Sequence, residues 1–178
     1  MKYLIVVDMQ NDFVTGPLGT PEAVAIVDRI KEKIEKNPDI KIIFTRDTHY
    51  RNYLHTFEGI KLPIKHCIFE TPGWCVVDSL REVAYKTYFS PGYINKYTFG
   101  NLNWGQEILD NGAVEEIEMV GVCTDICVIS NALILKATYP DIPITIDASC
   151  CAGTTPERHQ KALDVMKSCQ IEVINENI

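Results

Sequence analysis

A cysteine at a predicted helix start is the feature of this sequence best suited to nucleophilic chemistry. Residues 121–128 read G-V-C-T-D-I-C-V and lead from an apolar run into a helical pattern. If the helix begins near Thr124, Cys127 lies in its first turn, where unpaired N–H groups and the helix dipole favour a thiolate. A nearby ammonium would lower its pKa further, and a carboxylate could accept its proton. The competing interpretation is a small buried side chain at a packed helix start.

Carboxylates and histidines that could bind a metal ion gather between residues 47 and 66. Asp47 and His49 stand two residues apart where a predicted strand ends, so both side chains project on the same side. His55, Glu58 and His66 follow in an irregular segment. Such ligands suit zinc, manganese or iron. Because a loop histidine is more often exposed and idle, the residues alone leave a metal site undecided.

Apolar runs alternate with helical patterns along the whole chain. Strands are predicted at 2–7, 40–45, 93–97, 116–122, 143–146 and 171–174, and helices at 21–36, 74–83, 102–110, 124–138 and 155–168. Asn111-Gly112 is a good helix stop, whereas residues 50–73 show no sustained period. Repeated strand-then-helix order predicts an α/β fold with a mostly parallel sheet covered on both faces. The length suits one domain over residues 1–178.

The predicted sheet would bring the reactive residues together. In open parallel sheets, ligands bind beyond the carboxyl ends of the strands. Asp8, Asp47, Lys96 and the segment from Cys123 to Cys127 each lie at or just after such an end. We therefore expect one shared site built from four distant stretches of sequence.

Composition excludes several classes of partner. The formal net charge is −7, which argues against nucleic acid and against anionic membranes but allows a small neutral or cationic substrate. Seven cysteines without disulfide-scaffold spacing, and no signal-peptide pattern, favour reduced thiols and a cytoplasmic protein. No apolar run is long enough to span a membrane. Self-association into a homo-oligomer stays open.

Two motifs carry a resemblance to a known family. The segment G-V-C-T-D-I-C-V and the opening V-V-D-M-Q-N-D-F, residues 6–13, resemble the isochorismatase-like cysteine hydrolases, which include nicotinamidases, also called pyrazinamidases. The resemblance runs from residue 2 to the last strand and implies a three-layer Rossmann-like fold. It also implies a catalytic triad of Asp8, Lys96 and Cys127. A cis peptide between Val122 and Cys123 is implied too, with an oxyanion hole made by the N–H groups of Cys123 and Cys127.

Two lysines compete for the place in the triad. Lys86 in K-T-Y-F-S and Lys96 in K-Y-T-F-G both resemble the family's lysine followed by a hydroxyl and an aromatic residue. Lys96 ends a plausible strand and has about the family's usual separation from Cys127. Lys86 would need an insertion before the next helix, so Lys96 is the residue we predict.

The same resemblance implies a site for one divalent metal ion, zinc in the first place, with manganese or iron as alternatives. Its ligands would be Asp47, His49, His66 and a variable fourth residue. Glu58 follows His49 by nine residues and His55 follows it by six, and both spacings occur in the family. We favour Glu58 and keep His55 as the alternative.

The implied reaction is hydrolysis of nicotinamide to nicotinate and ammonia through a cysteine thioester. Phe13 resembles the aromatic residue that packs on the substrate ring, and Val122 would border the pocket. Many relatives have an aromatic residue where this chain has Pro63, so Leu62 or one of Tyr97, Phe99 and Trp104 would fill that wall. The alternative is another small amide, ureido or N-carbamoyl substrate. A rival of another class is a non-catalytic metal-binding or redox-sensing protein.

Overall fold

The central element of the computed structural model is a six-stranded parallel sheet. The structure describes residues 1–109 and 114–176, so the predicted stop at Asn111-Gly112 lies outside the described residues. The strand order is β3-β2-β1-β4-β5-β6, and every neighbouring pair is parallel. The strands are β1 (Lys2–Val7), β2 (Lys41–Asp47), β3 (Gly92–Lys96), β4 (Glu116–Val122), β5 (Ile144–Ala152) and β6 (Glu172–Ile174). The chain reverses its winding between β1 and β4, which is where a sheet of this order opens a crevice for ligands.

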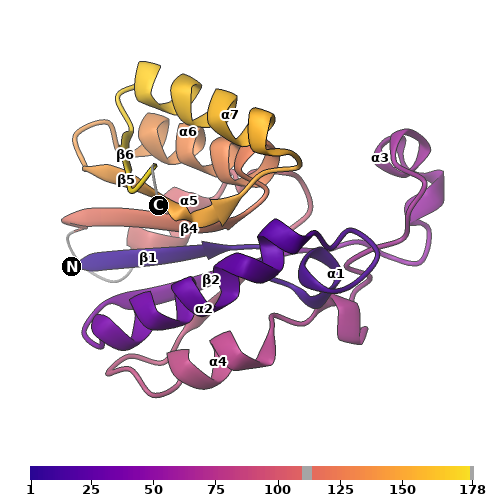
Figure 1. Cartoon of the computed structure of the whole chain (residues 1–178), viewed down its shortest axis with the longest axis horizontal. Helices are drawn as coiled ribbons and strands as arrows, with labels where there is room; N and C mark the ends of the chain where they lie inside the picture. Colours follow the sequence, from indigo (N-terminus) through magenta and orange to yellow (C-terminus); the bar gives the residue numbers. More distant parts are fainter. Residues whose placement is uncertain (110–113, 177–178) are drawn as a thin grey trace.

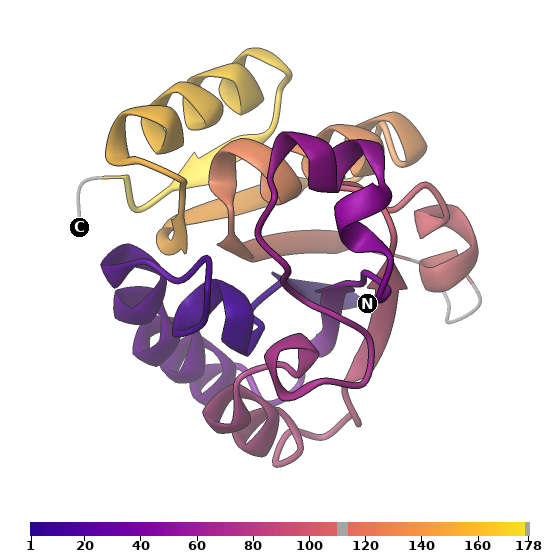
Figure 2. The ribbon, with the colours of Figure 1, turned by 90° about the vertical axis from the view of Figure 1, so that its right-hand side faces the viewer.

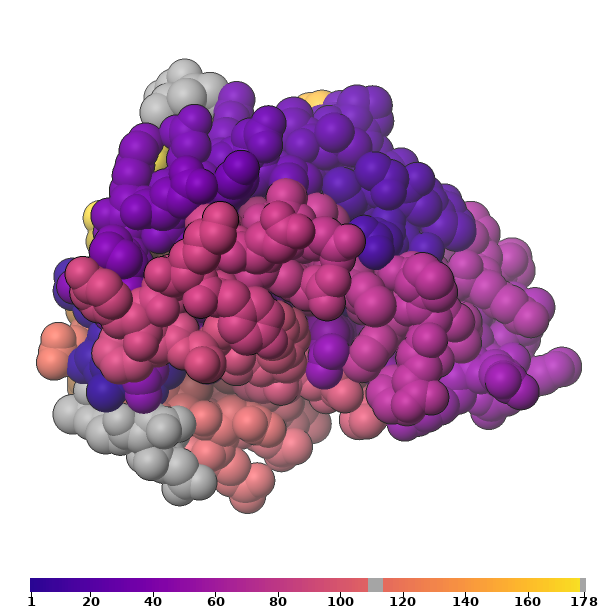
Figure 3. Space-filling model, turned by 90° about the horizontal axis from the view of Figure 1, so that it is seen from below, coloured from indigo at the N-terminus to yellow at the C-terminus, as the bar shows by residue number. Residues whose placement is uncertain are grey.

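Helices cover both faces of the sheet and make it the middle of three layers, as predicted (Figure 1). One face carries α5 (Trp104–Leu109), α6 (Ile129–Thr138) and α7 (Pro156–Ser168), and the other carries α2 (Pro21–Lys36) and α4 (Asp78–Ala84). Figure 3 looks onto the second face, where α2 and α4 form the surface. None of the described helices combines the length and hydropathy needed to cross a membrane.

The alternation of side chains along β1 divides the core in two. Ile5 and Val7 pack in the cluster under α5, α6 and α7, whereas Leu4 and Val6 pack in the cluster under α2 and α4. All four side chains are fully buried, as expected for the middle of a parallel sheet covered on both faces. The rigid centre of the sheet therefore fixes the strand ends from which the reactive residues project.

The predicted helix starts of α2 and α7 are present. The hydroxyl of Thr20 accepts a hydrogen bond from the Ala23 N–H at 3.0 Å, and Thr155 accepts one from the Arg158 N–H at 3.2 Å. In both helices proline occupies the first turn. These caps set where α2 and α7 begin, and both helices begin at the end of the molecule that holds the site.

Several elements differ from the sequence prediction. The irregular segment contains short helical turns, η1 (Tyr53–His55), α3 (Phe57–Lys61) and η2 (Pro72–Trp74), and α1 (Asn11–Val14) follows β1. The strand predicted at 143–146 continues to residue 152, because small buried side chains after Asp147 extend the pairing past a bulge opposite β4. The helix predicted from residue 124 begins as a π-helical turn, η3 (Thr124–Val128), before α6.

The segment that carries α3 stands beyond the carboxyl ends of the strands. Figure 1 shows α3 away from the sheet, and Figure 2, which looks onto that end, shows the segment passing across it. A β-bridge between His49 and Ile68 ties its two ends together. The segment thus forms an outer wall over the crevice between β1 and β4.

Candidate active site

Three strand ends bring an acid, a lysine and a cysteine into contact. Asp8 follows β1, Lys96 is the last residue of β3, and Cys127 lies in η3 directly after β4. The Lys96 Nζ atom lies 2.6 Å from Asp8 Oδ2 and 3.4 Å from Cys127 Sγ. All three residues are buried. Lys86, the alternative lysine, is exposed just after α4.

The backbone and a threonine hold Asp8 in place. Asp8 has a φ of 49°, which turns the chain sharply at the end of β1. Its Oδ1 atom accepts a hydrogen bond from Thr45 Oγ1 at 2.7 Å, and its N–H donates to the same hydroxyl at 3.1 Å. Burial raises the pKa of Asp8 above its ordinary value, although Lys96 opposes this. A carboxylate made more basic in this way is suited to accept a proton.

The surroundings of Cys127 oppose the thiolate that its place at a helix start would favour. Burial and the charge of Asp8 raise its pKa well above the ordinary value, and Lys96 only partly offsets them. Burial alone would lower the pKa of Lys96, but Asp8, Cys127 and Asp47 raise it above its ordinary value. The raised pKa values of Lys96 and Cys127 favour an ammonium beside a neutral thiol, with the Asp8 carboxylate as the nearby base.

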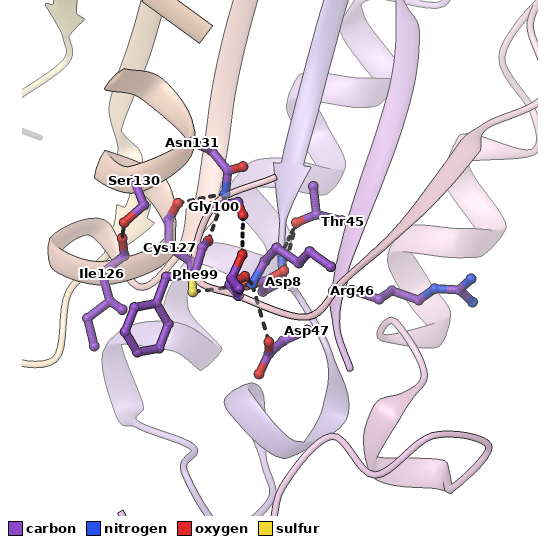
Figure 4. Close-up of polar contacts among 12 residues, drawn as sticks. Asp8, Thr45, Arg46, Asp47, Phe99, Gly100, Ile126, Cys127, Ser130 and Asn131 are labelled. Atoms are coloured by element: carbon purple, nitrogen blue, oxygen red, sulfur yellow. Dashed lines mark hydrogen bonds and ion pairs between the residues drawn. The ribbon is translucent and has the colours of Figure 1, made fainter. Parts of the chain in front are cut away.

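A buried asparagine fixes the turn that carries the cysteine. Asn131 Nδ2 donates to the carbonyl oxygens of Cys127 at 2.8 Å and Phe99 at 3.1 Å. Its Oδ1 atom accepts from the Asn101 N–H at 2.9 Å and from Trp104 Nε1 at 3.0 Å. Figure 4 shows Asn131 between the cysteine turn and the loop after β3. The asparagine thereby links the segment of Cys127 to the segment that follows Lys96.

Four potential metal ligands, here called the metal group, meet beside Asp8, Lys96 and Cys127. One donor atom from each of Asp47, His49, Glu58 and His66 lies within 4.8 Å of the others. His49 Nε2 is 2.9 Å from Asp47 Oδ2 and 3.5 Å from Glu58 Oε1, and His66 Nε2 is 3.6 Å from Asp47 Oδ2. His55, the alternative fourth ligand, is not in this group of described residues.

The hydrogen bonds of the two imidazoles fit a metal site. His66 Nδ1 lies 2.8 Å from the Ile64 carbonyl oxygen, which requires a proton on Nδ1 and leaves the Nε2 lone pair free. His49 Nε2 is buried and, despite its two carboxylate neighbours, makes no hydrogen bond within the described part of the chain. Such an orphaned buried nitrogen among carboxylates suits coordination of a divalent cation.

The backbone of Asp47 is clamped by Gln10. The side chain of Gln10 accepts from the Asp47 N–H at 2.8 Å and donates to the Asp47 carbonyl oxygen at 2.9 Å. It also donates to the Trp74 carbonyl oxygen at 2.8 Å. His49, His66 and Lys96 hold the pKa of Asp47 well below its usual range, even though burial opposes this. Asp47 is therefore an anion held rigidly between the triad and the imidazoles.

A cavity of about 370 Å³ extends from Cys127 to the metal group. Its described lining includes Cys123, Cys127, His66, Glu58 and Phe13. The Phe13 ring lies 5.4 Å from the His66 ring, measured between centroids, so this aromatic wall stands beside the metal group.

Of the other residues predicted to line the pocket, some line the cavity and others lie elsewhere. Val122, expected at the pocket, packs in the core under α2 and α4 and is not among the lining residues that the structure describes. Leu62 and Phe99 line the cavity, whereas Trp104 is a core residue and Tyr97 borders a neighbouring hollow. The peptide bond between Val122 and Cys123 is cis, as the resemblance implied.

Sequence reasoning missed several residues that organise the site. Gln10 lies in the opening motif, and Asn131 follows Cys127 by four residues, one helical turn along the same face. Those positions were signals that could have identified both. Thr45, which holds Asp8, and Arg158, which lines the cavity from α7, have no signal in the sequence.

Comparison with known proteins identifies the family. The isochorismatase domain family matches residues 2–177. The nicotinamidase of Schizosaccharomyces pombe is 27% identical over 209 residues, covering 97% of this chain and 92% of its own. The nicotinamidase/pyrazinamidase of Mycobacterium tuberculosis is 28% identical over 191 residues, covering 98% of each. The crystal structure of Pyrococcus horikoshii pyrazinamidase in complex with zinc is 27% identical, covers 98% of both chains and superposes with a TM-score of 0.81. The chain therefore belongs to the isochorismatase family.

Proposed function

We propose that this protein hydrolyses nicotinamide to nicotinate and ammonia with Cys127 as the nucleophile. The family and its nicotinamidase and pyrazinamidase relatives make the chain a hydrolase that acts on amides. The observation that carries the finer proposal is that one and the same cavity is lined by Cys127 and by Asp47, Glu58 and His66 of the metal group. A substrate held at that group would reach the cysteine within one pocket.

Asp8 is the proton acceptor and donor in the proposed mechanism. It takes the proton of the Cys127 thiol as the sulfur attacks the carboxamide carbon, and Lys96 stabilises the developing thiolate. The N–H groups of Cys123 and Cys127 hold the oxyanion. Asp8 returns the proton to the departing ammonia, leaving a thioester. It then takes a proton from water as the water oxygen attacks the thioester carbon. The carbon–sulfur bond breaks, the acid product is released, and Asp8 passes the proton to the sulfur of Cys127.

Asp47, His49, Glu58 and His66 would hold one divalent ion, and we propose zinc. The zinc bound by the Pyrococcus horikoshii pyrazinamidase supports this choice, as does the set of two imidazoles and two carboxylates. When bound, the ion would coordinate the ring nitrogen of the substrate and so orient the carboxamide toward the cysteine. Phe13 would pack against the ring from the side of His66.

The test is ammonia release from nicotinamide by the purified protein before and after chelation. Activity that the chelator removes and that added zinc, manganese or iron restores supports the proposal. Cys127→Ala should abolish turnover while the circular dichroism spectrum stays unchanged, and retained activity in that variant would refute the nucleophile. No release from folded, metal-loaded protein would refute nicotinamide as the substrate.

We also propose that the protein acts in the cytoplasm. All seven cysteines are free, including Cys150 and Cys151, which are adjacent and buried. Free thiols in this number suit a reducing compartment.

A further inference from the structure

A positively charged side chain lines the catalytic cavity from the helix opposite the metal group. Arg158 lies in the first turn of α7 and lines the same cavity as Cys127. It is exposed, so it stands at the mouth of the cavity rather than in the interior. The carboxylates of Asp47 and Glu58 line the cavity on the side of the metal group. The cavity is thus lined by carboxylates at the metal group, whose charge a bound divalent ion would offset, and by a guanidinium at α7.

Arg158 has no carboxylate partner within 4.0 Å in the part of the chain that the structure describes. Its guanidinium donates a hydrogen bond of 3.3 Å to the Thr154 hydroxyl. By contrast, Lys161, one turn along the same helix, forms an ion pair with Glu157 at 2.6 Å. In a chain with net charge −7, a guanidinium without an acidic partner beside the nucleophile is free to bind an anion.

The position of Arg158 is linked to the cysteine turn through two residues. Asp125, in η3, accepts hydrogen bonds from the Thr154 N–H at 2.7 Å and from the Thr154 hydroxyl. The Thr154 oxygen in turn accepts from Arg158. Because Asp125 lies two residues before Cys127, this chain of hydrogen bonds holds the guanidinium beside the turn where the reaction takes place.

Amide hydrolysis changes the charge of the molecule in the cavity. The substrate amide is neutral, whereas the acid product is a carboxylate, and at Cys127 it forms beside Asp8 and Asp47, whose charges Lys96 only partly offsets. A cation at the mouth distinguishes the two, since the carboxylate forms an ion pair with it and accepts a stronger hydrogen bond than the neutral amide oxygen does. We propose that Arg158 is an anion-binding residue that selects the carboxylate product over the amide and receives it on its way out of the cavity. The inference rests on the proposed function.

The experiment compares binding of nicotinate and nicotinamide to zinc-loaded protein by isothermal titration calorimetry. A Cys127→Ala background prevents turnover, and the ratio of the two dissociation constants is measured with and without Arg158→Gln. We expect Arg158→Gln to raise the dissociation constant of nicotinate about 3- to 10-fold more than that of nicotinamide. Arg158→Lys, which retains the charge without the planar fork, should have a smaller effect. Raising the salt concentration should weaken nicotinate binding to the Arg158 protein and much less to Arg158→Gln.

Lys161→Gln is the matched control, because it removes one positive charge one turn farther along α7. It should leave the ratio of dissociation constants unchanged. The inference is overturned if Arg158→Gln leaves the ratio unchanged, if Lys161→Gln alters it equally, or if nicotinate does not bind. Failure of the proposed function shows separately, as absence of ammonia release from nicotinamide by the protein with Cys127 intact.

Discussion

The carboxylate of Asp47 contacts both Lys96 of the proposed catalytic residues and His49 of the metal group. Asp47 Oδ1 lies 3.4 Å from Lys96 Nζ, and its Oδ2 atom lies 2.9 Å from His49 Nε2. The two residues are also paired in register at the ends of β2 and β3. The strand pairing therefore sets the distance between the metal group and Lys96, the lysine that faces Cys127.

This dual contact predicts different effects for two ligand substitutions. Asp47→Asn removes a ligand and one anion beside Lys96, so we expect it to lower zinc content and to change the rate at which iodoacetamide modifies Cys127 in metal-free protein. Among the described residues, Glu58 forms no hydrogen bond or ion pair with Asp8, Lys96 or Cys127, so Glu58→Gln should lower zinc content alone. Metal analysis and mass-resolved alkylation of Cys127 measure the two effects. Equal alkylation rates in both metal-free variants would contradict the connection.

Asp8→Asn should lower kcat for nicotinamide by about 10²- to 10⁴-fold, because an amide of the same size cannot accept the thiol proton. The substitution keeps an oxygen that can accept from Thr45, so the fold should be retained. Ammonia release under saturating substrate measures the loss. Asp28→Asn, an exposed acid on α2, serves as the control and should match the wild type. A loss of less than tenfold in Asp8→Asn would contradict its role as the base.

The sheet and the residues at its strand ends could be predicted because local pattern and topology act together. The apolar run of β1 ends at Asp8, and the rule for parallel sheets then places Asp8, Asp47 and Lys96 at one edge. Family resemblance was needed to select Lys96 over Lys86, since both have similar local sequences. Spacing could not decide between Glu58 and His55 as the fourth member of the metal group, because the short helical turns around residues 53–61 determine which side chain faces His49.

Neither the protonation state of Cys127 nor the hydrogen bonds that hold the site in place could be predicted from the sequence. The helix-start argument favours a thiolate at Cys127, but burial and Asp8 outweigh it, and neither is visible in the local pattern. Asn131 and Gln10 act through contacts with backbone atoms of residues distant in sequence, such as Phe99 and Asp47. Such contacts depend on tertiary packing and not on periodicity.

Asn131→Ala should destabilise the protein by at least about 3 kcal/mol, because each buried group left unpaired costs about 1–3 kcal/mol. Four partners lose their hydrogen bonds, among them the carbonyl oxygens of Cys127 and Phe99. Urea unfolding of metal-free protein measures the change. Ser130→Ala is the matched control. Among the described residues, the Ser130 hydroxyl bonds only to the Ile126 carbonyl oxygen one turn back, so its loss should cost under about 1 kcal/mol. Equal effects in the two variants would contradict the role given to Asn131.

The contacts of Asp147 predict how the free energy of unfolding depends on pH. Its Oδ2 atom pairs with Lys33 Nζ at 2.7 Å, and its Oδ1 atom accepts from the Ser149 hydroxyl at 2.7 Å and from Asn175 Nδ2 at 3.1 Å. Burial opposes ionisation, but Lys33, Ser149 and Asn175 outweigh it and lower the pKa of Asp147 below its ordinary value. The stabilisation is therefore complete above the pKa of an aspartate in the unfolded chain, about 3.9. It is lost as the pH falls through the lower pKa of Asp147 in the folded protein.

Asp147→Asn should remove this contribution, at a cost of about 1–3 kcal/mol near neutral pH. Between about pH 5 and pH 2 the wild type should then lose more stability than the variant, because only the wild type must protonate this carboxylate. Urea unfolding at a series of pH values measures the two slopes. Asp164→Asn is the control, since Asp164 also pairs with a lysine but is exposed, and its slope should stay close to the wild type. Parallel curves for wild type and Asp147→Asn would show that the Lys33 pair adds nothing to stability.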